Sequence, residues 1–190
     1  IASVTKLITA VAVFKLVEDG FIRPDEPMSK YIPQMDKEPF KELTIARVLS
    51  HSSGLPFDSD DSTSPYALIG KCKKGDDWIE AALKAGVTCK PGEQWIYSSF
   101  GYTLLGVLIG NVSGMRAEEY ITENILKPLG MKDSTFYPGP ELIKRHLIQF
   151  ESHEKMASDI LNGVKDPEQE NSIWSEVPET AGGLHSTALD

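Results

Sequence analysis

The sequence has little that would suit a nucleic acid, a membrane or a metal ion. Acidic residues outnumber basic ones by 28 to 19, so the formal net charge is −9. A protein that binds phosphate backbones carries the opposite excess. The longest apolar run, Leu7–Phe14, is interrupted by Thr9 and is too short to span a bilayer. The four histidines, at 51, 146, 153 and 185, have no metal-ligand spacing. We therefore expect no nucleic-acid partner, no transmembrane segment, no metal and no other cofactor.

Cysteine is also scarce, with only Cys72 and Cys89, both in a segment rich in loop residues. Two interpretations stay open here: a bridge between them, or two free thiols in a reducing compartment. We predict that folding requires no bridge, because the Lys-rich segment around Cys72 is typical of an exposed loop. Free thiols slightly favour the cytoplasm. The chain begins at Ile1, and we expect the natural N-terminus to lie upstream, so the compartment stays undetermined.

What the sequence does contain is ordinary globular material, 41% hydrophobic and 25% charged over 190 residues. This amount supports one domain, or a piece of one, with a genuine core. Hydrophobic periodicity and turn residues predict several helices, joined by an extended connection over 23–35 and a long polar loop over 54–75 with a short helix near 66–70. The predicted helices cover 3–19, 43–55, 76–86, 100–114, 116–130 and roughly 140–150, and a polar stretch follows over 151–176.

The opening segment, IASVTKLITAVAVF, places Ser3 and Lys6 one helical turn apart at the head of a helix that is apolar on almost every face. Ser3 suits the N-cap and Gly20 the C′ position of this helix. A hydroxyl there lies in the positive end of the helix field. Poor solvation would disfavour the ammonium form of Lys6, and a neutral amine beside a hydroxyl activates a nucleophile. The Ser3 amide is placed to donate to an oxyanion. The S-x-x-K pattern by itself also occurs by chance.

Five blocks along the chain make a more specific pattern than S-x-x-K. They are SVTK at 3–6, VLSHSSGL at 48–55, PGEQWIYSSFGYTLLG at 91–106, ILKPLGMKDSTF at 125–136 and AGGLHSTALD at 181–190. In this order they resemble the serine beta-lactamase-like superfamily over essentially the whole chain. The most similar branch contains class C beta-lactamases, family VIII esterases and fungal acyltransferases such as the lovastatin-pathway acyltransferase. The resemblance implies a mixed α/β fold of the beta-lactamase/transpeptidase type.

The resemblance assigns roles to three residues and raises one question. The first superfamily motif supplies the nucleophile and its lysine, here Ser3 and Lys6. The second is a Tyr followed two positions later by a polar residue, often Asn, and here it is Tyr97 with Ser99. Tyr97 is then implied as general base or proton relay, whereas without the resemblance packing beside Trp95 is the favoured explanation. Ser99 offers one hydroxyl where an Asn offers donor and acceptor, which weakens the case for recognition of a beta-lactam amide.

The superfamily's third motif, a Lys or His followed by a small residue and Gly on an edge strand, does not occur in this sequence. HSSG at 51–54 is not that motif, because it belongs to the helical region. The strands that precede the nucleophile helix are missing too. We therefore expect residues 1–190 to form a partial beta-lactamase-related domain, namely the helical subdomain and the nucleophile helix. Most of the antiparallel sheet, both its N-terminal strands and the C-terminal strands with the third motif, is expected to lie outside.

Other residues have simpler explanations. Ser99 and His185 are candidate substrate contacts, the latter because the resemblance places the GGLHST turn at the border of the cleft. His51 is expected to pack or to form local hydrogen bonds. Acidic residues over 58–61 are expected to be solvated, with shaping of substrate access as the alternative. The remaining expectations are surface positions for His146 and His153, and core or rim packing rather than an acyl pocket for Trp95 and Trp174.

The leading functional hypothesis is a serine hydrolase or acyltransferase that acts on a small ester or activated acyl group through an acyl-Ser3 intermediate. A beta-lactamase or D-Ala peptidase on the same scaffold is the first alternative. A non-catalytic family member that serves as a binding module is the second. The sequence leaves the acyl donor, the acceptor and the oligomeric state open.

Overall fold

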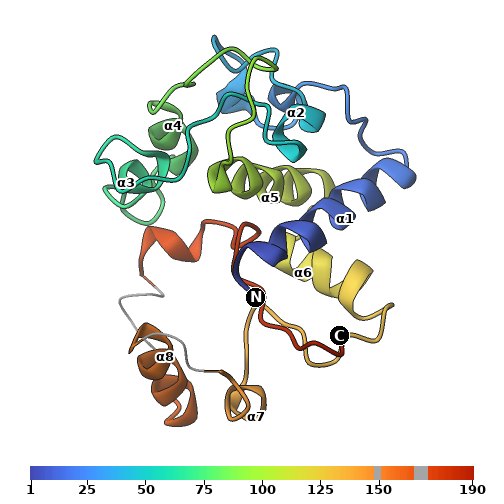
Figure 1. Ribbon diagram of the computed structural model, residues 1–190, viewed down its shortest axis with the longest axis vertical. Helices are drawn as coiled ribbons and strands as arrows, with labels where there is room; N and C mark the ends of the chain where they lie inside the picture. Colours follow the sequence, from blue (N-terminus) through green and yellow to red (C-terminus); the bar gives the residue numbers. More distant parts are fainter. Residues whose placement is uncertain (148–150, 165–170) are drawn as a thin grey trace.

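The computed structural model describes residues 1–147, 151–164 and 171–190 (Figure 1). Within these ranges the chain is helical and forms no β-strand, and its extended pairings are two isolated bridges, Pro27 with Thr44 and Thr135 with His185. The α-helices are α1 (Thr5–Glu18), α2 (Ile45–Leu49), α3 (Pro65–Ile69), α4 (Trp78–Leu83), α5 (Ser99–Ser113), α6 (Ala117–Ile121), α7 (Pro140–Ile143) and α8 (Glu151–Leu161). Shorter turns are η1 (Ala2–Val4), η2 (Met28–Lys30), η3 (Pro33–Met35), the π-helical η4 (Thr122–Leu126) and η5 (Ile173–Ser175).

Helix α5 forms the centre of the core, because α1, α2 and α6 all pack against it (Figure 1). It starts after Ser98, whose hydroxyl accepts the Gly101 N–H, and stops at Gly114 in a left-handed conformation. Because the helix has few polar side chains on any face, neighbouring elements can bury it from several directions. The fully buried ones are Leu104, Leu105, Leu108 and Ile109.

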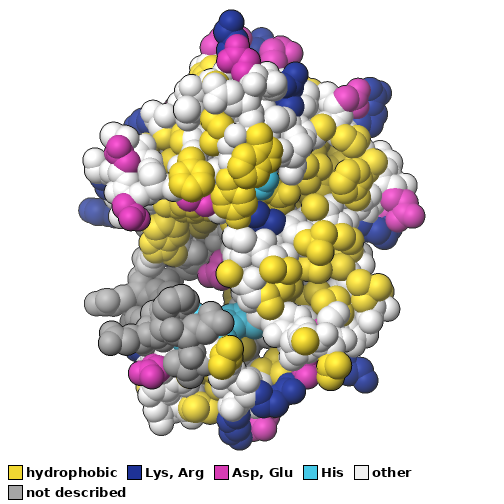
Figure 2. Space-filling model, viewed as in Figure 1, with side chains coloured by type: hydrophobic (Ala, Val, Ile, Leu, Met, Phe, Trp, Pro, Cys, Tyr) yellow, Lys and Arg dark blue, Asp and Glu magenta, His cyan; other side chains and the backbone are white. Residues whose placement is uncertain are grey.

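Helix α1 is covered on one side only, although it is apolar on almost every face. Its buried side chains, Ala12, Val13 and Leu16, belong to the hydrophobic core that α5 shares. The opposite face exposes an apolar stripe formed by Val4, Leu7, Val11 and Phe14, spaced three and four residues apart. Apolar side chains gather on the corresponding flank of the molecule in Figure 2. We call these four residues the α1 stripe.

The ends of α1 match the expectation at one terminus and correct it at the other. Gly20 has φ +78° immediately after the C-cap Asp19, as predicted for a C′ glycine. At the start, Val4 is the N-cap, and Ser3 lies one residue earlier, inside the turn η1. The Ser3 hydroxyl is therefore not a helix cap, and it is engaged by side chains instead.

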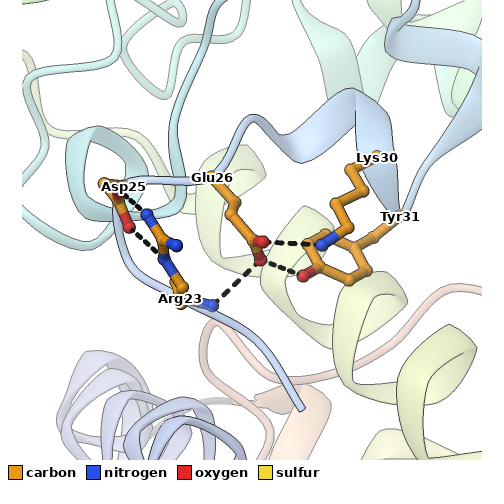
Figure 3. Close-up of polar contacts among 5 residues, drawn as sticks. All are labelled: Arg23, Asp25, Glu26, Lys30 and Tyr31. Atoms are coloured by element: carbon orange, nitrogen blue, oxygen red, sulfur yellow. Dashed lines mark hydrogen bonds and ion pairs between the residues drawn. The ribbon is translucent and has the colours of Figure 1, made fainter. Parts of the chain in front are cut away.

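The connection over 23–35 is not simply extended, because short turns and a polar cluster organise it (Figure 3). The Glu26 carboxylate accepts from Lys30 Nζ at 2.6 Å, from the Tyr31 hydroxyl and from the Arg23 backbone N–H at 3.0 Å. These contacts, the Lys30 bond foremost, lower the pKa of Glu26 to about 2. Arg23 also pairs with Asp25 at 2.6 Å. The cluster fixes the turn that follows α1.

The short helix expected to start near Thr44 is confirmed as α2, with Thr44 as its N-cap. Three other expected elements differ in extent. The one expected over 116–130 is α6 continued by the π-turn η4. Only α7 is present from the helix expected near 140–150, of which positions 148–150 lie outside the described residues. The polar stretch 151–176 contains α8, which the polarity of the segment concealed.

Cys72 and Cys89 are both free thiols in the structure, and that folding requires no bridge between them stays a prediction. Among the described helices, none has both the length and the apolarity that a membrane crossing demands.

Candidate active site

Ser3, Lys6 and Tyr97 meet at the start of α1. Lys6 Nζ donates to Ser3 Oγ at 3.1 Å, and the Tyr97 hydroxyl donates to the same oxygen at 2.7 Å. The ammonium of Lys6 also lies 4.8 Å from the centre of the Tyr97 ring. Three groups separated by up to 94 positions in the sequence thus form one hydrogen-bonded cluster. Its geometry is that of a hydroxyl with two groups in hydrogen-bond contact that can exchange a proton with it.

Lys6 is held from the far end of the chain. Its side chain is only 6% exposed, and Nζ donates to the Ala181 carbonyl at 2.8 Å. That carbonyl has a fixed position because the neighbouring Thr180 is fully buried and bonded twice. The Thr180 hydroxyl donates to Tyr102 O at 2.8 Å, and the Thr9 hydroxyl donates to Thr180 O at 2.7 Å. The buried amine is therefore aimed at Ser3 by a chain of buried hydrogen bonds.

Close approach between α5 and the segment at 178–181 depends on Gly106. A Cβ at this position would lie 2.4 Å from the Thr180 hydroxyl and 2.6 Å from Pro178 Cβ. No side chain larger than hydrogen fits there without displacing the segment that carries Ala181.

Tyr97 is surrounded by aromatic rings and by the Lys6 charge. The His51 ring lies 4.6 Å from the Tyr97 ring, and Trp95 lies 6.3 Å away. Burial raises the pKa of Tyr97, but hydrogen bonding and charge from Lys6, together with the Ser3 hydroxyl, lower it by more. The pKa of this phenol therefore ends below its ordinary value. A phenol with this shift is a better proton acceptor near neutral pH than a free tyrosine.

His51 supports Tyr97 from behind, as expected for a residue with local contacts. Its Nδ1 accepts the Ser98 N–H at 3.2 Å, so this nitrogen is the unprotonated one. Burial and the Lys6 charge lower the pKa of His51, which favours that neutral state. His51 has φ +57°, and Ala2, next to Ser3, has φ +44°. Non-glycine residues adopt such conformations rarely and at a cost, often next to functional groups.

A cleft of about 750 Å³ opens in front of Ser3. Ser99 lies on its wall, but its polar groups are already engaged. The Ser99 N–H and hydroxyl donate to the two carboxylate oxygens of Asp58 at 2.8 and 2.5 Å. Asp58 and Asp60 line the cleft, so the acidic loop is part of the site and not only a solvated surface.

His185 does not line this cleft. Its Nδ1 lies 3.1 Å from Nε2 of His146, and the His153 ring lies 5.4 Å from that of His146. The expectation of surface positions for His146 and His153 was wrong, because these side chains are half-buried against one another. Burial and the neighbouring histidines lower the pKa of both His146 and His185.

The two tryptophans lie at the edge of the site. Trp95 is 68% exposed and contacts His51 edge-on at 5.9 Å, so its packing is peripheral. Trp174 lines the cleft with Tyr66, their ring centres being 6.3 Å apart.

Sequence reasoning did not find the roles of Asp58 and Ala181. No local motif marks either, although both lie in blocks or loops already considered for the site. Among the described residues, no group of three or more His, Cys, Asp or Glu is arranged to hold a metal.

Comparison with known proteins agrees with this geometry. The family model described as Beta-lactamase matches residues 1–190. Protein flp of Staphylococcus aureus (strain MW2) is 37% identical over 139 residues, which cover 72% of this chain and 27% of flp. The D-alanyl-D-alanine-carboxypeptidase/endopeptidase AmpH of Escherichia coli (strain K12) is 31% identical over 154 residues, 78% of this chain and 39% of AmpH.

A similar solved structure is the octameric penicillin-binding protein homologue from Pyrococcus abyssi. It has a TM-score of 0.64 and 30% identity, and the match covers 100% of this chain and 42% of that one. The chain therefore spans less than half the length of each of these three proteins.

Proposed function

Because this chain belongs to the beta-lactamase family, whose fold it shares, we propose that it carries the nucleophile and the proton-transfer groups of a serine hydrolase or acyltransferase. The observation that supports this most strongly is the convergence of Lys6 Nζ and the Tyr97 hydroxyl on Ser3 Oγ. The preferred substrate is a small ester or an activated acyl group, and no cofactor takes part.

The reaction has two steps at Ser3. Its Oγ attacks the acyl carbon while its proton passes to Tyr97 or to Lys6, and the Ser3 amide donates to the developing oxyanion. The bond to the leaving alcohol breaks, the alcohol takes up the proton, and an acyl-Ser3 ester remains. Water or a second alcohol then attacks this ester, and the same groups move the proton in the reverse sense.

Labelling by a fluorophosphonate tests the proposal, because only an activated serine attacks the phosphorus and displaces fluoride, which leaves a phosphonylated Ser3. In the full-length protein we expect labelling that Ser3→Ala abolishes. Lys6→Met and Tyr97→Phe should each slow it by roughly 10²–10⁴, the usual contribution of a positioned acid or base. Lys127→Met serves as a matched control for Lys6→Met, since Lys127 pairs with Glu123 at the surface and does not line the site. Labelling that persists in Ser3→Ala would contradict the assignment. A protein that is never labelled would instead fit the non-catalytic binding module.

A beta-lactamase or D-Ala peptidase is the second candidate, favoured by the 31% identity to AmpH. Ser99 argues against it. Its hydroxyl already donates to Asp58, and Ser lacks the side-chain amide with which an Asn at this position can bind a beta-lactam. Turnover of a chromogenic cephalosporin, compared with a short-chain p-nitrophenyl ester, separates the two activities. His185 remains a predicted substrate contact, and on present geometry it would have to leave His146 to reach the cleft.

The α1 stripe is explained if residues 1–190 are part of a longer domain whose sheet covers this face and supplies the second oxyanion donor. The 190-residue chain alone should then self-associate through the stripe and hydrolyse esters roughly 10²–10³ more slowly than the full-length protein. Replacing Leu7 and Phe14 with Gln should reduce association of the short chain. In the full-length protein it should cost about 1.5–3 kcal/mol per residue. Sedimentation and urea unfolding measure both. A monomeric short chain with undiminished activity would refute this part.

A further inference from the structure

Asp58 determines what charge the wall of the cleft presents. Its carboxylate accepts hydrogen bonds from both the backbone N–H and the hydroxyl of Ser99. Ser99 therefore has no proton left to donate to a substrate. The group that lines the cleft at this position is therefore a carboxylate with its remaining lone pairs, and Ser3 lines the same cleft.

The rest of the wall adds negative charge and aromatic surface. Among the described residues that line the cleft, the charged ones are Asp58, Asp60 and Glu179, and no Lys or Arg is present. Burial and Glu118 raise the pKa of Glu179. The nearby ammonium of Lys6 is committed to Ser3 and to the Ala181 carbonyl and does not line the cleft.

The aromatic part of the wall is formed by Tyr66 and Trp174, whose rings lie 6.3 Å apart. Burial, with a smaller effect of the Asp58 charge, raises the pKa of Tyr66 to about 12, so its ring is neutral. Aromatic faces next to carboxylates bind organic cations, because the ring quadrupole and the negative charge act in the same sense. A carboxylate or sulfonate in the same place would be repelled by Asp58 and Asp60, and the described lining offers it no Lys or Arg.

We propose that Asp58 is a specificity-determining residue of this site and that it selects substrates whose acyl part carries a cationic group over isosteric substrates that carry an anion. The inference rests on the proposed acyl transfer at Ser3 and names its substrate class.

Three p-nitrophenyl esters of equal chain length test the proposal in the full-length protein. Their acyl parts are γ-trimethylammonio-butyrate, the neutral analogue with carbon in place of that nitrogen, and γ-sulfobutyrate. We expect kcat/KM to fall in this order, with the cationic ester at least about tenfold above the anionic one at low salt. Screening should compress this ratio between about 0.01 M and 1 M ionic strength, as the Debye length falls from about 30 to about 3 Å.

Variants identify the responsible charge. Asp58→Asn should reduce the cationic-to-anionic ratio about tenfold. Asp61→Asn removes the same charge from the same loop but outside the cleft lining, and the ratio should stay as in the wild type. Ser99→Ala keeps the carboxylate, so the order of the three esters should also persist. If Asp58→Asn does not fold, the salt series of the wild type decides.

The outcomes separate the two levels of the argument. Turnover that depends on Ser3 but shows equal rates for the three esters, or a ratio that salt and Asp58→Asn leave unchanged, overturns the role of Asp58 alone. Absence of Ser3-dependent turnover for every ester and of fluorophosphonate labelling overturns the proposed function, and the inference with it.

Discussion

Replacing Thr180 with Val should damage the site from a distance, because Thr180 holds the carbonyl that positions Lys6. The substitution preserves shape and removes only the hydroxyl that donates to Tyr102 O. The Thr9 contact to Thr180 O remains. Tyr102 O lies within α5 and keeps its helical partner, so the lost bond should cost about 1–2 kcal/mol. At roughly 2–4 °C per kcal/mol for a domain of this size, the melting temperature should fall by several degrees.

The activity should fall further than this stability loss explains. Freed from Tyr102, the segment with Ala181 can drift, and Lys6 Nζ loses the 2.8 Å contact that aims it at Ser3. Misplacement of about 1 Å can reduce rates roughly 10²-fold. We therefore expect fluorophosphonate labelling of Ser3 to slow by roughly 10–100-fold at a temperature where Thr180→Val is still folded, as followed by circular dichroism.

Matched variants make this test strict. Thr180→Ser keeps the hydroxyl and should retain most of the labelling rate. Gly106→Ala disturbs the same segment from the other side, whereas Gly110→Ala meets its nearest neighbour, Met115 O, at an ordinary 3.4 Å. The first should therefore slow labelling and the second should not. If Thr180→Val is destabilised as expected but labels Ser3 at the wild-type rate, the segment does not position Lys6 and the argument is wrong.

Two further predictions concern stability. Burial and the neighbouring histidines lower the pKa of His146 and His185 in the folded chain. The unfolded chain therefore binds more protons than the folded one as pH drops below about 6.5, and the free energy of unfolding should decline there. Urea midpoints from about pH 7.5 to pH 5 should show a shallower decline for His146→Gln than for the wild type, and equal slopes would contradict it. Gly20→Ala, with φ +78° and open space around it, should cost about 1 kcal/mol. Gly54→Ala, at the same φ but with its Cβ 2.2 Å from Cys89 O, should cost clearly more, and thermal melts that rank the two equally would refute the steric argument.

The sequence was sufficient to predict the cluster of Ser3, Lys6 and Tyr97, because their spacing and the blocks around them form a recognisable pattern. The start of α5 and the stop of α1 at Gly20 were also predictable, since capping residues act locally. These features depend on neighbours in the chain or on motifs. Short segments of the sequence are therefore enough to determine them.

The features that were missed depend on contacts between distant segments. Asp58 was expected to be solvated or to shape substrate access, and only the folded chain shows that it contacts Ser99, 41 positions away. The half-burial of His146 and His153 follows from the placement of α7, α8 and the turn at His185. The exposed face of α1 has the composition of a buried one, so hydrophobicity alone could not reveal which side the described chain leaves open.

The contact between Lys6 and Ala181 joins residues 175 positions apart, and this has a consequence for the order of events in folding. The Ser3–Lys6 pair is complete as soon as one helical turn forms, which takes well under a microsecond in general. Its orientation waits for a closure that spans almost the whole chain, and such distant closures are slow and costly in entropy. A half-folded or half-synthesised chain would therefore possess the serine and the lysine but not their alignment. If Ser3 is the proposed nucleophile, its activation therefore waits until the segment at Ala181 has docked against Lys6.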